Sequence, residues 1–77
     1  MKELESIAWE MVNIFIDEVI ARKLIRWGKD YAVFTGNTTE WRTLRSLART
    51  KIAKKYNLDT NDLLTISDLF NDFVRFV

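Results

Sequence analysis

Proline is absent from this chain of 77 residues, and its only two glycines, Gly28 and Gly36, lie in one short stretch. Residues that end or kink a helix are therefore missing from the segments on either side of that stretch. Both segments carry apolar residues at helical spacing, and the length suits one domain with a single core. We therefore predict an all-α fold in which residues 1–77 form a single helical domain, a compact bundle of three main helices.

The first helix is predicted to run from Lys2 to Trp27. Its apolar side chains form two rows, and a helix that is apolar on two sides must be covered on two sides. One row is therefore the expected interface with a second copy or with a protein partner: Trp9, Val12, Ile16, Val19 and Ile20. Gly28 is expected to supply the left-handed residue after this helix. Of the three tryptophans, Trp27 is the one expected to be exposed.

The connection to the second helix admits several structures. Residues 31–34 fit an extended segment, a single helical turn or a packed loop. The second helix is predicted over residues 38–56, because Asn37 and Glu40 have the spacing of a capping box. Asn57 suits a left-handed residue at the end of that helix.

The third helix is expected to begin after Asp59, its N-cap. Its apolar face is predicted to be Leu63, Ile66, Phe70, Phe73 and Val77. Thr65 and Asp68 also have the spacing of a capping box. A break near residue 65, followed by a short fourth helix, is therefore an alternative to one continuous helix. Residues 52–59 resemble the turn of a helix-turn-helix motif. The helix after this turn is acidic and phosphate would repel it, so we interpret the helix-turn-helix-like corner as structural.

The composition excludes most catalytic chemistry. The chain has no His and no Cys, so it lacks nucleophilic triads, thiol nucleophiles, imidazole bases and the usual zinc ligands. Asp68 and Asp72 lie one helical turn apart, but two carboxylates supply fewer oxygens than a hard cation generally needs. We expect no enzymatic activity, no metal, no cofactor and no small-molecule substrate.

Charge is distributed unevenly along the chain. Residues 22–56 carry ten basic residues against two acidic ones, whereas the flanking segments are net acidic. At helical spacing, the arginines of the second helix share one side with short hydroxyl residues, a pattern that suits phosphate. The residues expected to bind nucleic acid are Arg42, Arg45, Ser46, Arg49, Thr50, Lys51, Lys54 and Lys55. The alternative is that these cations are a solvated face or pair with the acidic flanks.

These patterns predict a non-enzymatic binding module, an accessory or regulatory subunit. It would contact the backbone of DNA or RNA through the basic second helix and self-associate through the first. The alternative function is a protein–protein adaptor or assembly subunit with no nucleic-acid role. Neither a secretory signal nor a membrane-spanning stretch is found, so a cytoplasmic location is expected.

Overall fold

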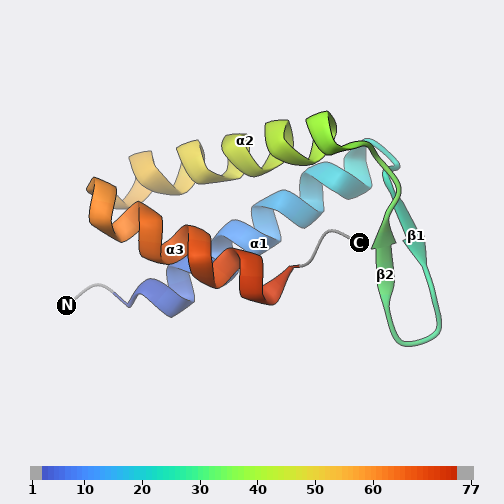
Figure 1. Ribbon diagram of the computed structural model, residues 1–77, viewed down its shortest axis with the longest axis horizontal. Helices are drawn as coiled ribbons and strands as arrows, with labels where there is room; N and C mark the ends of the chain where they lie inside the picture. The colour runs from blue at the N-terminus through green and yellow to red at the C-terminus, as the bar shows by residue number, and fades with distance from the viewer. Residues whose placement is uncertain (1–2, 75–77) are drawn as a thin grey trace.

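The computed structural model describes residues 3–74, and Figure 1 shows three helices with a β-hairpin at one end. The elements in chain order are α1 (Leu4–Ala21), β1 (Ile25–Trp27), β2 (Ala32–Phe34), α2 (Thr38–Tyr56) and α3 (Thr60–Phe73). The chain is mostly helical and its three helices form a compact globule. The all-α prediction is therefore right for the helices and wrong for the hairpin, which forms a two-stranded sheet.

α1 is the central helix of the globule. It packs against both α2 and α3, which contact one another much less. The core consists of twelve side chains from the three helices: Ile7, Ala8, Met11, Val12, Phe15, Val19, Trp41, Leu44, Ala48, Ile52, Ile66 and Phe70. The two apolar sides of α1 are thus covered largely by its own companions. Val12 and Val19, both 3% exposed, are core residues, and Val12 is therefore not available for the predicted interface.

α1 ends earlier than the sequence predicts. The helix stops at Ala21, and Lys23, with φ 58°, is the residue that adopts the left-handed conformation. Gly28 does not have a positive φ. A helix continued to Trp27 would carry the chain about 9 Å further, at 1.5 Å per residue. The turn instead returns Leu24 and Ile25 to the core, against which both are packed.

The hairpin replaces the predicted last turns of the first helix. β1 and β2 pair in antiparallel register, with Ile25 opposite Phe34 and Trp27 opposite Ala32. Of the three interpretations of residues 31–34, the extended segment is the one that the structure contains. Gly28 lies under the Tyr31 ring, and a Cβ there would come within 2.7 Å of the ring atoms. A side chain at this position would displace the exposed Tyr31 ring, and Gly28 does not serve a left-handed turn.

α2 has the bounds that its end signals predict. The Glu40 N–H donates to Asn37 Oδ1 at 2.8 Å, and the Asn37 N–H donates to Glu40 Oε1 at 3.1 Å. This is the predicted capping box. Asn57 ends the helix with φ 51°, as predicted. Leu58 follows and packs against the core, so the turn toward α3 is closed by local side chains.

α3 is one continuous helix. Asp59 caps it by accepting from the Asp62 N–H at 2.8 Å, which confirms the predicted start. The break considered near Thr65, and with it the short fourth helix, is wrong. Ile66 and Phe70, both 0% exposed, lie one turn apart, and a continuous helix keeps both on its buried side. Val77 of the predicted apolar face lies outside the described residues.

Candidate functional site

α2 carries its basic residues on two different sides. On the side next to α1, Lys51 pairs with Glu18 at 3.6 Å and Lys55 pairs with Glu10. These two lysines were predicted to bind nucleic acid, but here they compensate carboxylates of α1. The prediction that some cations pair with the acidic flanks therefore holds for this side of the helix.

The Glu10 carboxylate joins α1 to two side chains of α2. It accepts hydrogen bonds from the Lys55 ammonium and from the Tyr56 hydroxyl. The bond from Lys55 is the main cause that lowers the pKa of Glu10, and Tyr56 lowers that pKa further. In return, Glu10 raises the pKa of both Lys55 and Tyr56. This side of α2 is therefore a structural contact with its charges balanced.

The other side of α2 faces α3 and holds the three arginines. Arg45 Nη1 donates to Asn71 Oδ1 of α3 at 3.3 Å. Arg49 has its Nε buried with no hydrogen-bond partner, and Arg42 is exposed. Within residues 3–74, the ion pairs of the structure involve none of these arginines. Their charge is therefore not neutralised by the described part of the chain.

The spacing of residues along α3 keeps two of its acidic residues away from these arginines. The row of α3 that lies beside α2 contains Leu63, Ser67 and Asn71, spaced one helical turn apart. Asp68 and Asp72 each follow one residue later in the chain, so they lie about 100° further round the helix. Asp68 and Asp72 thus project away from the row that contains Leu63 and Asn71, and the Asn71 amide lies next to Arg45.

Toward the end of α2, a shallow depression of about 460 Å³ opens between this helix and the first turns of α3. Its lining contains no carboxylate among the described residues: Ser46, Arg49, Thr50, Ala53, Lys54, Asn57 and Leu63. Four of the predicted nucleic-acid contacts line this depression together, and Arg42 and Arg45 continue along the helix from it. We call the following set the arginine surface: Arg42, Arg45, Ser46, Arg49, Thr50 and Lys54.

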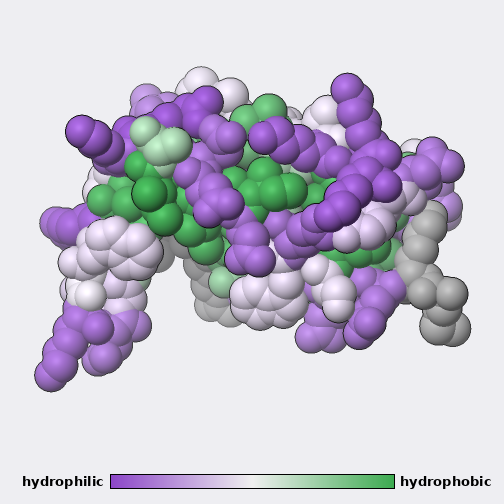
Figure 2. Space-filling view, turned by 180° about the vertical axis from the view of Figure 1, so that it is seen from behind, coloured by the Kyte–Doolittle hydropathy of each residue, from purple (hydrophilic) through white to green (hydrophobic). Residues whose placement is uncertain are grey.

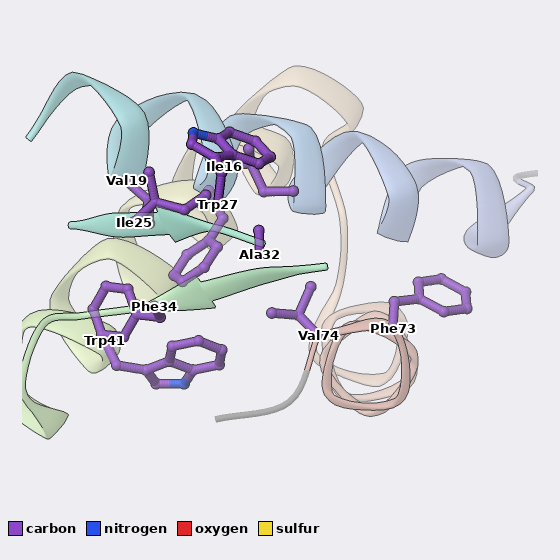
Figure 3. A pocket seen from close by; sticks show the side chains of 10 residues that line it. Ile16, Val19, Ile25, Trp27, Ala32, Phe34, Trp41, Phe73 and Val74 are labelled. Atoms are coloured by element: carbon purple, nitrogen blue, oxygen red, sulfur yellow. The ribbon is translucent and has the colours of Figure 1, made fainter. Parts of the chain in front are cut away.

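A second feature lies at the opposite end of the bundle, where the hairpin meets the helices. It is an apolar cleft of about 260 Å³, and Figure 3 shows side chains from both strands and all three helices around it. The lining is Phe15, Ile16, Val19, Ile25, Trp27, Ala32, Phe34, Trp41, Phe73 and Val74. Trp27 is 66% exposed at this cleft, as predicted for that tryptophan. Figure 2 shows the hairpin projecting from the body of the molecule, with hydrophobic side chains gathered near its base.

Sequence reasoning missed this cleft because it assigned β1 to a helix. A signal was present in two short stretches rich in aromatic and β-branched residues, residues 25–27 and 31–34, on either side of a segment that contains Gly28 and Asp30. The predicted α1 interface is divided by the structure. Val12 is in the core, and Val19 and Ile16 both line the cleft. Trp9 stacks on Phe73 with ring centroids 4.0 Å apart, and Ile20 is 44% exposed.

Within the described part of the chain, no helix combines the length and the hydropathy that crossing a bilayer requires. Comparison with protein-family models, with curated proteins and with solved structures finds no match to this chain.

Proposed function

We propose that this chain is a non-enzymatic binding module that contacts a nucleic-acid backbone through the arginine surface. The observation that supports this proposal is the contrast between the two sides of α2. The lysines beside α1 pair with carboxylates, whereas no carboxylate pairs with the arginines beside α3 within residues 3–74. An anionic partner would supply the negative charge that this side of the molecule lacks.

The side chains of the arginine surface suit phosphate. A guanidinium group binds phosphate oxygens through two parallel N–H donors, and nearby hydroxyls add shorter hydrogen bonds. Ser46 and Thr50 are both exposed beside Arg49. From Arg42 to Lys54 the surface extends about 18 Å along the helix at 1.5 Å per residue. That length supports contact with several successive phosphates of one strand.

The proposed contact is with the backbone and not with base edges. α3 follows the helix-turn-helix-like corner, and its exposed acidic residues, Asp68 and Asp72, would be repelled by phosphate in a groove. Phosphate contacts set affinity and orientation but carry no sequence information. We therefore propose similar affinity for unrelated sequences. A nucleic-acid partner is compatible with the cytoplasmic location expected from the sequence.

The second candidate function is a protein adaptor or assembly subunit with no nucleic-acid role. It is favoured by the exposed aromatic residues near the hairpin, Trp27 at 66% and Tyr31 at 65%. In that case the arginine surface would meet an acidic protein.

Fluorescence anisotropy with labelled duplex DNA, single-stranded DNA, RNA and poly-glutamate separates the two functions. Nucleic-acid binding predicts salt-sensitive binding to at least one of the three nucleic acids and weaker binding to poly-glutamate at equal charge. Binding to poly-glutamate alone, or to nothing at low ionic strength, would reject the nucleic-acid function.

A further inference from the structure

We propose that the hairpin is an arm that stacks on nucleic-acid bases, so that the strand bound by this chain is unpaired DNA or RNA. This inference rests on the proposed function, and it names the form of nucleic acid, which a phosphate-binding surface alone does not select. The evidence is one face of the hairpin, where an exposed tyrosine ring lies over a glycine and on the same face as an arginine.

The two exposed aromatic residues of the hairpin lie on opposite faces of it. The Gly28 N–H donates to the Tyr31 carbonyl oxygen at 2.7 Å, which continues the antiparallel pairing one residue beyond each strand. Arg26 pairs with Val33, two residues after Tyr31. Because side chains along a strand alternate between its faces, Tyr31 and Arg26 share one face of the hairpin. Trp27 lies on the other face, which lines the apolar cleft (Figure 3).

The Tyr31 ring is packed on one side and open on the other. A Cβ at Gly28 would lie 2.5 Å from the ring Cζ and 2.7 Å from both Cε atoms, so one side of the ring lies over the Gly28 backbone. The side chain is nevertheless 65% exposed. A ring whose position is set before binding loses little conformational freedom when a ligand packs on it. Its open side can therefore serve as a stacking platform.

Only an unpaired base has a face available for such a ring. Inside a duplex, neighbouring base pairs cover both faces of each base, whereas unpaired bases can turn outward and stack on aromatic side chains. The hairpin extends from the end of the bundle and projects from the body of the molecule (Figure 1 and Figure 2), so its tip is accessible to a strand. The ring therefore selects unpaired nucleic acid.

The charges of the hairpin favour a nucleotide as the ligand on this face. From residue 23 to residue 34 the chain has three basic residues and one acidic residue: Lys23, Arg26, Lys29 and Asp30. Within residues 3–74, the ion pairs include none of the three basic residues. A nucleotide combines a flat ring with a phosphate, so Tyr31 and Arg26 on one face match its two parts.

The hairpin also lies at the end of the molecule where the arginine surface begins. Residues 35–37 join β2 to α2, and Arg42 stands about 6 Å along α2 from its first residue, at 1.5 Å per residue. Figure 1 shows this end of α2 next to the base of the hairpin. A strand whose phosphates follow the arginine surface can thus continue to the hairpin.

The first test separates base stacking from phosphate binding. Fluorescence anisotropy measures the affinity for oligo(dT), for oligo(U) and for an abasic strand of the same length and charge. The unmodified chain should bind oligo(dT) or oligo(U) about tenfold more tightly than the abasic strand, as expected for one stacked base. A duplex with a central unpaired bubble should likewise be bound more tightly than a fully paired duplex of the same length and charge.

The second test locates the ring by substitution. Tyr31→Leu and Trp27→Leu each remove one aromatic ring of nearly equal exposure, 65% and 66%, without a change in charge. Tyr31→Leu should abolish the preference for strands with bases, whereas Trp27→Leu, on the other face, should retain it within about twofold. Tyr31→Phe should retain it as well, because a phenylalanine ring also stacks on bases. Circular dichroism checks that the variants stay folded.

Two further variants test the position of the ring and the cation on its face. The backbone at Gly28 does not have a positive φ, so alanine is tolerated there, but its Cβ must displace the Tyr31 ring. Gly28→Ala should therefore weaken binding to oligo(dT) by about threefold and leave binding to the abasic strand unchanged. Arg26→Gln should reduce the slope of log affinity against log salt for a single strand by about 0.7 units.

Three results would overturn the stacking arm and leave the phosphate contact of the arginine surface intact. One is salt-sensitive binding that is equal for the abasic strand and for both strands with bases. Another is an equal loss of affinity in Tyr31→Leu and Trp27→Leu. The third is a Tyr31→Leu variant that weakens binding to oligo(dT) and to the abasic strand by the same factor, since the ring would then not act on bases. Absence of salt-sensitive binding to every probe would instead reject the proposed function, and the stacking arm with it.

Discussion

The Tyr56 hydroxyl, at the end of α2, donates a hydrogen bond to the Glu10 carboxylate in the middle of α1. The two residues are 46 positions apart in the chain. Lys55 binds the same carboxylate, so a single acidic group of α1 fixes the position of the last turn of α2. This contact holds in place the helix that carries the arginine surface.

We predict that Glu10→Gln lowers the free energy of unfolding by up to about 1 kcal/mol near pH 7, the range of partly exposed ion pairs. Because the folded state lowers the pKa of Glu10 below 4.5, the carboxylate stabilises the fold above that pH. The contribution is lost as pH falls through the folded-state pKa. Urea denaturation of both proteins between pH 3 and pH 7 measures this. A difference in stability that stays constant down to pH 3 would show that Glu10 does not act through its charge.

The same contact predicts a change at high pH. The folded state raises the pKa of Tyr56, chiefly through the bond to Glu10. Stability from this bond is therefore present below the ordinary tyrosine pKa and is lost as pH rises through the raised value. Spectrophotometric titration should show one tyrosine of the unmodified chain ionising above pH 10, and Glu10→Gln should return it toward 10. A Tyr56 hydroxyl whose pKa is the same in the unmodified chain and in Glu10→Gln would contradict the contact.

Val12→Glu should destabilise the chain by more than about 3 kcal/mol, a large part of the stability of a small domain. Val12 is 3% exposed in the core, where a carboxylate has no partner. Asn13→Glu, one position along on the exposed side of α1, is the control and should change stability by no more than about 0.5 kcal/mol. Urea denaturation followed by circular dichroism gives both values. If Val12→Glu produced a stable folded monomer, Val12 would be an interface residue and not part of the core.

Lys23→Gly should stabilise the chain by about 1 kcal/mol, because a non-glycine residue is disfavoured in the left-handed conformation. Lys23 has φ 58° directly after α1. Arg22→Gly is the control, since Arg22 has φ −93° and gains nothing from a glycine. A higher melting temperature for Lys23→Gly only would confirm the early end of α1. A lower one would favour a helix that continues through residue 23.

An element of this fold can be predicted from the sequence when neighbouring residues alone determine where it begins and ends. The start of α2 is determined by the side chains of Asn37 and Glu40, which bind the backbone, and its end by Asn57, which suits the left-handed conformation. Both signals can be recognised in the sequence alone. The end of α1 cannot be recognised in this way, because no glycine or proline marks Lys23 and the apolar period continues to Leu24. The hairpin depends on pairing between strands and on packing against the core, which are not local properties.

The candidate site was likewise predictable only where the spacing of residues along one helix determines it. Helical spacing brings the arginines of α2 onto one side, and this needs no tertiary structure. Which basic residues are compensated depends on which helix lies on each side of α2. Charge alone does not distinguish Lys51 and Lys55 from the arginines. In the folded chain, Glu18 and Glu10 of α1 pair with these two lysines. Only the packing of the three helices separates the two sets.

The most direct test of the arginine surface compares two variants that each lose two positive charges, R42A/R49A and K51A/K55A. Binding to a labelled nucleic acid is measured by anisotropy over a series of salt concentrations. The arginine pair should weaken binding to every sequence alike and reduce the slope of log affinity against log salt by about two units, one for each phosphate contact. The lysine pair should change that slope by less than about half a unit, because its charges are already engaged with α1. Equal changes in slope for the two variants would contradict the account, since binding would then follow net charge and not the arginine surface.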